Sequence, residues 1–143
     1  HSCFMGVVKS LKALAAIPPK ARSKAVKAKI AELAEFILIH RVHKKSHDLS
    51  KVSKPGWLKF GFPLMYQTDA LEILCILAEL GIEDARASEA ADAVLAARGA
   101  DGRWMLANSF NGKTLVAIER KGEASKWITA RARDALAGQG RTP

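Results

Sequence analysis

The sequence predicts a single all-α domain in which about five main helices associate as hairpins and pack in two layers. Three observations support this fold class. Apolar residues recur every three or four positions in five segments, which is the spacing of one face of a helix. Glycines, prolines and polar clusters separate these segments, as expected where helices end. One segment is apolar on all sides, which is typical of a central helix, whereas the next has a single apolar stripe, which is typical of an outer one.

The first two helices are expected to form a helical pair within residues 1–43. The first covers residues 4–17 and ends at Pro18 and Pro19, because the residue before a proline is disfavoured in the helical conformation. The second covers residues 20–43 and begins with four lysines and an arginine, whose charge opposes the helix dipole. Other contacts must therefore stabilise its start. The two apolar stripes comprise Phe4, Val7, Val8, Leu11, Leu14 and Ala15, and Val26, Ile30, Leu33, Ala34 and Ile37.

Residues 44–68 are predicted to form a loop followed by an aromatic-rich crossing. The polar stretch 41–53 is typical of a mobile loop. The following stretch, residues 54–69, contains two prolines and two glycines, which exclude a regular helix or a central strand. It also contains four aromatic residues, so we expect it to pack on the helices, with Trp57 and Phe60 buried.

Residues 69–137 are predicted to contain the other three helices, in repeats that include tryptophans. The third helix, residues 69–80, is almost entirely apolar, and Asp69 followed by Glu72 resembles a capping box at its start. The fourth, residues 84–98, carries a stripe of small residues. The short link between the two helices predicts an antiparallel hairpin.

The stretch from residue 100 to residue 124 has no helical period. Residues 106–110 and 114–118 could form a short hairpin across an Asn-Gly turn. A last helix follows at residues 126–136, capped by Ser125, and residues 138–143 are expected to be a tail. The inward-facing residues of this last helix are predicted to be Trp127, Ile128, Ala132, Ala135 and Leu136.

The formal net charge of +9 raises the possibility of a nucleic-acid or anionic-membrane partner. A solvated basic surface, on a fragment whose acidic remainder is missing, is the simpler explanation, because charge alone indicates non-specific association. No apolar run reaches the ~18 residues of a membrane span. The chain does not begin with Met, so we expect a piece of a longer protein. Two cysteines are too few for a disulfide framework and fit a reducing cytoplasm.

Two segments carry a family resemblance. The Asp-Gly-Arg-Trp of residues 101–104 resembles the Asp-Gly-x-Trp turn of terpenoid-cyclase and protein-prenyltransferase repeats, the prenyltransferase and squalene oxidase type. Residues 122–129 resemble the Gly-x-x-Ser-x-Trp-x-Thr start of the next repeat helix. The Phe-Gly-Phe-Pro within residues 54–69 is similar to a segment of bacterial proteins that carry such repeats and have no settled activity.

The resemblance implies that this chain is part of an α/α toroid, in which helical hairpins form an inner and an outer barrel. Five helices are fewer than a closed toroid needs, so we expect apolar edges that are covered by self-association or by the remainder of a longer chain. The candidate edges are the face of the first helix, with Phe4, Val8, Leu11 and Ala15, and the face of the last, with Ile128, Ala132 and Leu136.

The chemistry of the family does not carry over to this chain. The Asp-x-Asp-Asp acid motif of squalene–hopene-type cyclases is missing, and so is the Asp-x-Cys pair with which protein prenyltransferases hold zinc. No catalytic residue and no cofactor are therefore predicted. What the resemblance does imply is an apolar, isoprenoid-like ligand in a central cavity of the complete protein.

Six residues are candidates for lining such a cavity. Aromatic residues of this kind belong more often to a core, and Asp69 is more simply a helix N-cap than a buried acid with a raised pKa. Both interpretations stay open at this stage. The six candidates are Trp57, Phe60, Tyr66, Asp69, Trp104 and Trp127.

Three histidines are weak metal candidates. His40, His43 and His47 would share a face if the second helix continued through them. The simpler interpretation is a basic helix C-terminus, which suits the helix dipole, so no metal is predicted.

Two other functions compete with ligand binding. One is a non-enzymatic helical-repeat scaffold that binds a protein. The other is a basic helical domain that binds nucleic acid through residues 20–29 and 41–59. The second is disfavoured, because those lysines have no stacking aromatic residues among them apart from the crossing.

Overall fold

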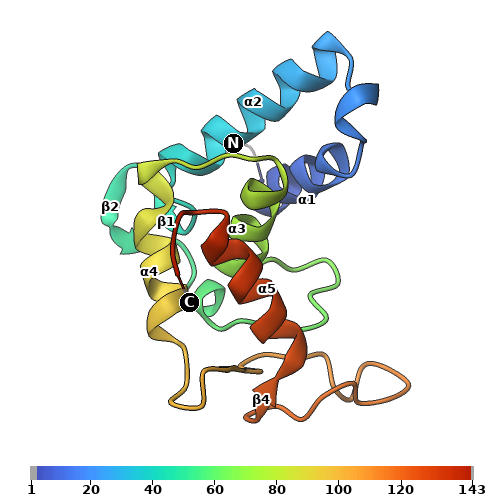
Figure 1. Cartoon of the computed structure of the whole chain (residues 1–143), viewed down its shortest axis with the longest axis vertical. Coiled ribbons are helices and arrows are strands. Elements are labelled where there is room, and N and C mark those ends of the chain that lie inside the picture. Colours follow the sequence, from blue (N-terminus) through green and yellow to red (C-terminus); the bar gives the residue numbers. More distant parts are fainter. Residues whose placement is uncertain (1–2, 143) are drawn as a thin grey trace.

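The computed structural model describes residues 3–142 and is mostly helical, with two small antiparallel sheets that the all-α prediction missed (Figure 1). The α-helices are α1 (Phe4–Ala15), α2 (Lys24–Ile39), α3 (Ala70–Glu79), α4 (Ser88–Ala96) and α5 (Lys126–Ala137). Single turns of 3-10 helix are η1 (Pro19–Ala21), η2 (Pro55–Leu58) and η3 (Ala85–Ala87). The strands are β1 (Lys44–Lys45), β2 (Asp48–Val52), β3 (Trp104–Met105) and β4 (Ala124–Ser125).

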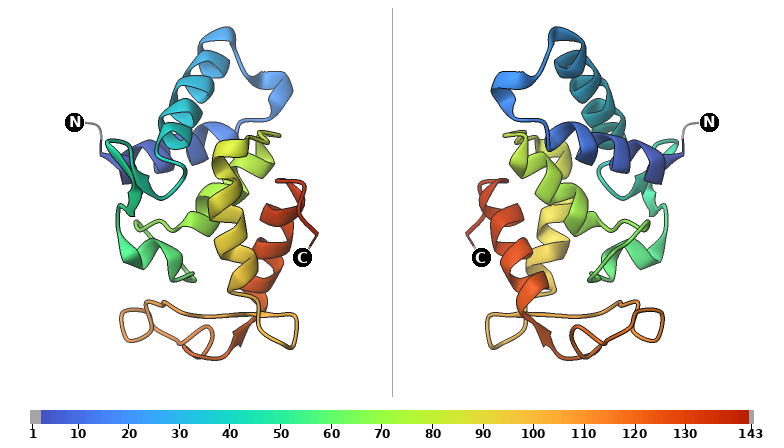
Figure 2. Two further views of the ribbon diagram at one scale, coloured as in Figure 1. Left: turned by 90° about the vertical axis from the view of Figure 1, so that its left-hand side faces the viewer. Right: turned by 90° about the vertical axis from the view of Figure 1, so that its right-hand side faces the viewer.

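The central helix is α3, as its apolar sequence predicts. Seven of its ten residues are buried, and it contacts α1, α4 and α5. Figures 1 and 2 show α1 and α2 at one end of the molecule, next to a group formed by α3, α4 and α5, while residues 100–124 cross the opposite end. The core therefore surrounds α3.

The start of α2 differs from the prediction. Residues 19–21 form η1, and α2 begins only at Lys24, because the Ser23 hydroxyl accepts a hydrogen bond from the N–H of Val26 at 3.2 Å. The Arg22 guanidinium donates to the carbonyls of Ala15 and Ile17, both at 2.8 Å, and so satisfies the end of α1. This N-cap and this arginine supply the contacts that the basic start of α2 requires.

The end of α2 also differs. The helix stops at Ile39 and not at residue 43, and Arg41 and Val42 have positive φ angles, which turn the chain out of the helix. The turn brings the Val42 side chain into the core. The predicted loop at residues 41–53 is in fact the hairpin β1–β2, in which Lys44 faces Val52 and Lys45 faces Asp48.

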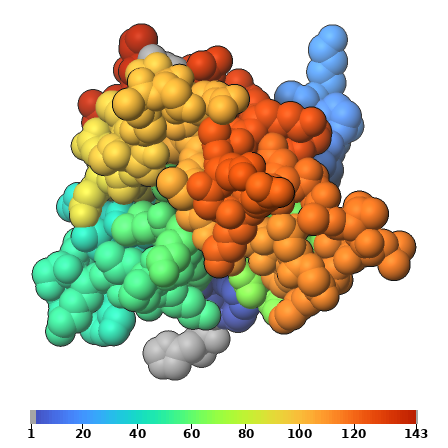
Figure 3. All heavy atoms as spheres, turned by 90° about the horizontal axis from the view of Figure 1, so that it is seen from below, coloured from blue at the N-terminus to red at the C-terminus, as the bar shows by residue number. Residues whose placement is uncertain are grey.

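The predicted hairpin of residues 106–110 with 114–118 is wrong. Instead, β3 pairs with β4, placing Trp104 opposite Ser125 and Met105 opposite Ala124. The side chains of Trp104 and Leu106 are both fully buried, which fixes this register. Residues 109–121 form an excursion that projects from the body (Figures 1 and 3), with Leu115, Val116 and Ile118 exposed along it.

The expected open edges are also wrong. The face of α1 packs on α2 and α3, and the face of α5 packs on α3 and α4. Phe4 is half-buried, and the other residues of the two predicted edges are buried within this one chain, namely Val8, Leu11, Ala15, Ile128, Ala132 and Leu136. Self-association therefore has no open helix face of this kind to cover.

The fourth helix and the tail are more tightly attached than predicted. Asp84 caps η3, and α4 itself begins at Ser88. After α5, the side-chain amide of Gln139 donates to the carbonyl of Ile82 at 2.8 Å, and Arg141 forms an ion pair with Asp92 at 2.9 Å. The tail is thus fixed to the α3–α4 hairpin, apart from residue 143, which lies outside the described residues.

Trp104 and Trp127 have different environments, although both were predicted to face inward. Trp104 is fully buried and its indole N–H donates to the carbonyl of Val94 at 2.6 Å. Trp127 is 43% exposed and stacks on Phe62 at a ring separation of 5.0 Å. Because α5 directs the side chain of Ile128 into the core, the side chain of Trp127, one position earlier, faces the surface.

Replacing Trp104 by alanine should lower the free energy of unfolding by ~3–5 kcal/mol, because it leaves a large cavity in the core. Trp127→Ala is the matched control and should cost only ~1 kcal/mol, since it loses one exposed stacking contact. Urea denaturation of both variants measures the difference. Equal losses would contradict the core position of Trp104.

Candidate functional site

The crossing of residues 54–69 is an ordered segment that packs on the core, as predicted. Its rings Trp57 and Phe60 are buried. The carbonyl of Phe60 accepts hydrogen bonds from the N–H groups of Ala107 and Asn108, both at 3.1 Å, which join the crossing to the segment after β3. These contacts hold the crossing in place beside the start of α3.

Asp69 ends the crossing and caps α3. One carboxylate oxygen accepts a hydrogen bond from the N–H of Glu72 at 2.7 Å, and the other accepts from the N–H of Gly61 at 2.9 Å. The side chain is only 2% exposed, and this burial raises the pKa of Asp69 to about 6, despite the two backbone donors that lower it. Asp69 is therefore both the N-cap and the buried acid that the sequence left as alternatives.

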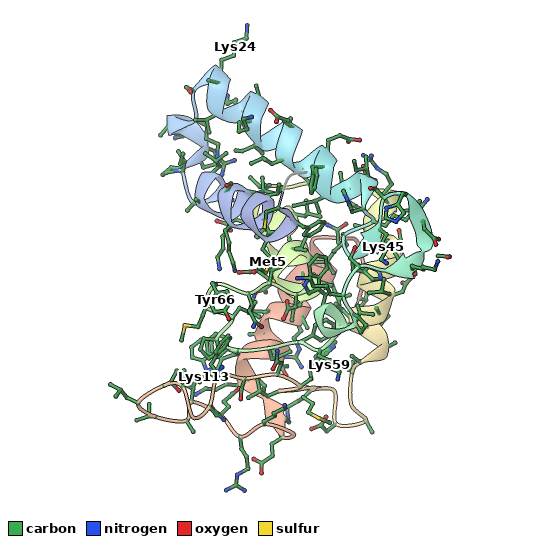
Figure 4. The ribbon with its side chains drawn as sticks, turned by 180° about the vertical axis from the view of Figure 1, so that it is seen from behind. Met5, Lys24, Lys45, Lys59, Tyr66 and Lys113 are labelled. Carbon is green, nitrogen blue, oxygen red and sulfur yellow. The ribbon has the colours of Figure 1, made fainter. Side chains whose placement is uncertain are left out.

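A cleft of about 310 Å³ has Asp69 among its lining residues, and we call it the Asp69 cleft. Lys54 and Lys59 contribute cationic side chains to it, and Gln67 and Asn108 contribute amides. In Figure 4, Met5, Tyr66 and Lys59 lie around it, on the face opposite to that of Figure 1. The apolar and aromatic part of the lining consists of Met5, Trp57, Leu64 and Tyr66.

Glu72, one turn into α3, is a second buried acid with a different environment. Its carboxylate accepts hydrogen bonds from the ammonium groups of Lys9 and Lys12 of α1, both at a closest distance of 2.8 Å. Burial raises the pKa of Glu72, but the hydrogen bonds from Lys12, Lys9 and Thr68 outweigh it, and the net pKa is lowered. Glu72 therefore does not complete the capping box by reaching back to Asp69, because its carboxylate is directed to α1.

The six residues predicted to line a ligand cavity do not form one group. Trp57, Tyr66 and Asp69 line the Asp69 cleft together. Phe60 and Trp104 are core residues, and Trp127 lies on the surface. Sequence reasoning missed Met5, Lys54, Lys59, Gln67 and Asn108. Lys54, Lys59 and Gln67 lie within the aromatic crossing itself, which was the available signal for them, whereas Met5 and Asn108 come from two separate segments.

The three candidate histidines are not brought together, because α2 ends before them. A ring nitrogen of His40 donates to the carbonyl of Phe36 at 2.7 Å, and a ring nitrogen of His43 donates to the carbonyl of Arg41 at 3.0 Å. His43 is buried, whereas His47 is exposed on the β1–β2 turn. Within residues 3–142, no three His, Cys, Asp or Glu side chains are grouped as metal ligands.

Neither protein-family models, nor curated proteins, nor solved structures contain a match to this chain. The function must therefore be argued from the site itself. In the described part of the chain, none of the helices has the length and apolar character needed to cross a membrane.

The raised pKa of Asp69 predicts a pH-dependent stability. Its folded-state value of about 6 lies above the usual 3.8, so the folded protein binds this proton more tightly than the unfolded chain does. The resulting stabilisation is complete below about pH 4 and is lost as the pH rises through about 6. An Asp69→Asn variant cannot titrate. Between these limits the stability of wild type relative to Asp69→Asn should therefore fall by ~3 kcal/mol.

Urea denaturation of both proteins from pH 4 to pH 7 measures this change, and other titrating groups largely cancel in the comparison. A difference in stability that stays constant with pH would contradict a buried carboxyl with a raised pKa.

Removing both lysines that contact Glu72, as Lys9→Met with Lys12→Met, should leave a buried carboxylate without its partners. We expect a loss of ~3 kcal/mol in unfolding free energy at pH 7, with partial recovery at acidic pH as Glu72 becomes protonated. Lys24→Met with Lys27→Met, at the exposed start of α2, removes the same charge and serves as the control. If the two double variants were equally stable, Glu72 would not depend on these lysines.

Proposed function

We propose that this chain is a helical ligand-binding domain whose Asp69 cleft takes one end of an apolar, isoprenoid-like molecule. The observation that carries the proposal is a buried carboxyl of raised pKa in a cleft whose other walls include aromatic and aliphatic side chains. Small-molecule sites combine apolar and aromatic walls with polar groups that orient the ligand. The Asp69 cleft combines four apolar or aromatic side chains with two lysines, two amides, a hydroxyl and the carboxyl. We assign no reaction to the site.

The lining suggests which end of such a molecule binds. Met5, Trp57 and Leu64 offer apolar contact to a hydrocarbon chain. Each oxygen of Asp69 already accepts one backbone hydrogen bond and retains a second acceptor position. A ligand hydroxyl can use that position. The expected ligand is therefore a hydrocarbon chain with a terminal hydroxyl group, directed toward Asp69.

The resemblance to terpenoid-cyclase and prenyltransferase repeats extends this proposal to the complete protein. In that case the α3–α4–α5 group would form part of the wall of an α/α toroid, with Trp104 in its repeat turn. Because the apolar faces of α1 and α5 are buried within this chain, the toroid would have to continue from another surface. The excursion of residues 109–121 is exposed and apolar enough to provide one. The free thiols of Cys3 and Cys75 suit the reducing cytoplasm in which we place it.

Calorimetric titration with farnesol, an isoprenoid alcohol, tests the proposed ligand class. We expect saturable binding that weakens by about tenfold in Tyr66→Ser, because the exposed ring of Tyr66 is a wall of the cleft and its loss removes ~1.4 kcal/mol of contact. Leu49→Ser, an apolar-to-polar change on β2, is the control and should bind as wild type does.

Two results would contradict the proposal. One is the lack of saturable binding to the wild-type protein. The other is equal affinity of Tyr66→Ser and wild type, which would place the alcohol elsewhere on the surface.

A protein-binding scaffold is the second candidate function, and the excursion of residues 109–121 favours it. Leu115 is fully exposed, and Val116 and Ile118 are largely exposed beside it. Apolar side chains gathered on a projecting segment are typical of contact surfaces. The surface could join two copies of this chain or bind a different protein. Light scattering on wild type and on the double variant Leu115→Ser, Val116→Ser separates these alternatives, since loss of an oligomer in the variant would show that the surface joins copies of this chain.

A further inference from the structure

A second hollow, of about 560 Å³, adjoins the Asp69 cleft at Trp57. We call it the Phe36 groove. Its walls come from the start of α1, the end of α2, the β1–β2 turn and the residues around Trp57. Trp57, Met5 and Lys54 line both hollows, so the two are neighbours. Its volume falls within the range of roughly 300–1,000 Å³ that small-molecule sites occupy.

Aromatic rings form one side of the Phe36 groove. The ring of Phe36 lies 4.5 Å from that of His40 and 5.7 Å from that of Phe4, and Phe4 lies 4.5 Å from Trp57. Trp57 is buried beneath the others, whereas Phe4, Phe36 and His40 are only half-buried. A flat ring could therefore stack on the part of this aromatic array that solvent reaches.

The orientation of His40 adds a specific polar group. Its Nδ1 faces the carbonyl of Phe36 at 2.7 Å, and because a carbonyl can only accept, Nδ1 carries the hydrogen. This leaves Nε2 as the nitrogen that can accept a hydrogen bond from a ligand. A base with an exocyclic amino group offers such a donor.

Positive charge forms the other side of the groove. Lys45 and Lys54 line it, with the imidazole of His47 beside them, and no carboxylate side chain is among the described residues that do. Asp48, which follows His47, is engaged by Ser50 and by Lys51 at 2.9 Å. The charge is therefore not neutralised from within the groove, and an anionic group is the complementary ligand.

We infer that the Phe36 groove binds a nucleotide, with the base against Phe36 and His40 and the phosphate against Lys45, His47 and Lys54. Lysine recognises phosphate as a point charge, and bases stack on aromatic side chains whatever their sequence.

The sequence disfavoured nucleic acid because it shows few aromatic residues among the lysines, but the fold brings Phe4 and Phe36 to them. Phe36 and Lys45 line the Phe36 groove and not the Asp69 cleft, whereas Lys54 and Trp57 line both. Variants of Phe36 and Lys45 therefore test this inference separately from the proposed function.

The nucleotide could be free or part of a single strand, and one experiment separates these sources. Adenosine monophosphate and a fluorescent ten-base oligoadenylate are titrated into the full chain at low salt. Similar affinity for the two identifies a mononucleotide site. Much tighter binding of the oligomer identifies a single-stranded nucleic acid whose backbone also contacts neighbouring lysines.

Variants locate the site. Lys45→Gln and Phe36→Leu should each weaken binding by about fivefold or more, since each removes one of the two proposed contacts. Lys24→Gln removes a lysine at the far end of α2 from Lys45 (Figure 4) and should bind as wild type does. Tyr66→Ser, which affects only the Asp69 cleft, should also leave nucleotide affinity unchanged.

Three outcomes would overturn the inference. The first is the lack of nucleotide binding to wild type. The second is an equal loss of affinity in Lys24→Gln and Lys45→Gln, which would indicate general attraction to a basic surface. The third is wild-type affinity in Lys45→Gln. Phe36 packs on Phe4, so its variant is also checked by urea denaturation. If Phe36→Leu does not fold, Lys45 at the half-exposed rim still decides the result.

Discussion

The first turn of α3 begins inside the molecule, where its backbone N–H groups are removed from water. Asp69 satisfies one of them and, through its other oxygen, the N–H of Gly61 in the crossing. Glu72 in the same turn is held by Lys9 and Lys12 of α1. Two side chains therefore connect the central helix to the crossing that precedes it and to α1, which is distant in sequence. Loss of Asp69 would leave buried backbone N–H groups unpaired, and loss of the two lysines would leave the buried Glu72 carboxylate without its cations, both of which are costly changes.

The same two acids show how local partners determine charge. They lie three positions apart and both are buried, yet burial dominates at Asp69, whereas hydrogen bonds from two ammonium groups dominate at Glu72. Backbone N–H groups stabilise a carboxylate less than a full positive charge does. Of the two acids, the one that lines the cleft is Asp69, whose hydrogen-bond partners are backbone N–H groups and not ammonium groups. The burial of Asp69 at the start of α3 therefore both caps the helix and gives the candidate site its carboxyl of raised pKa.

Much of the fold could be predicted from the sequence, because helical periodicity is a local property. The apolar faces of α1, α3 and α5 and the caps at Asp69 and Ser125 follow from nearest neighbours along the chain. The end of α2 could not be predicted, since the chain leaves the helix in order to bury Val42. The pairing of β3 with β4 depends on tertiary burial of Trp104.

The candidate site was predicted only in part, for a related reason. Trp57, Tyr66 and Asp69 are close in sequence, so one aromatic-rich stretch identified all three. Met5 reaches the cleft from α1 and Asn108 from the segment after β3, and no local pattern indicates that they meet. The aromatic array of Phe4, Phe36 and Trp57 was missed because its members lie on three separate elements.

The position of Trp57 has a consequence for how the two hollows behave together. One indole serves as a wall of both, with the ring of Phe4 packed 4.5 Å away. If both hollows are occupied as proposed, and one occupant shifts this ring, the two binding equilibria would be thermodynamically linked. Such linkage is reciprocal: the factor by which the first occupant alters the affinity for the second equals the factor in the opposite direction. A single buried side chain would then let this small helical domain sense one molecule through its affinity for another.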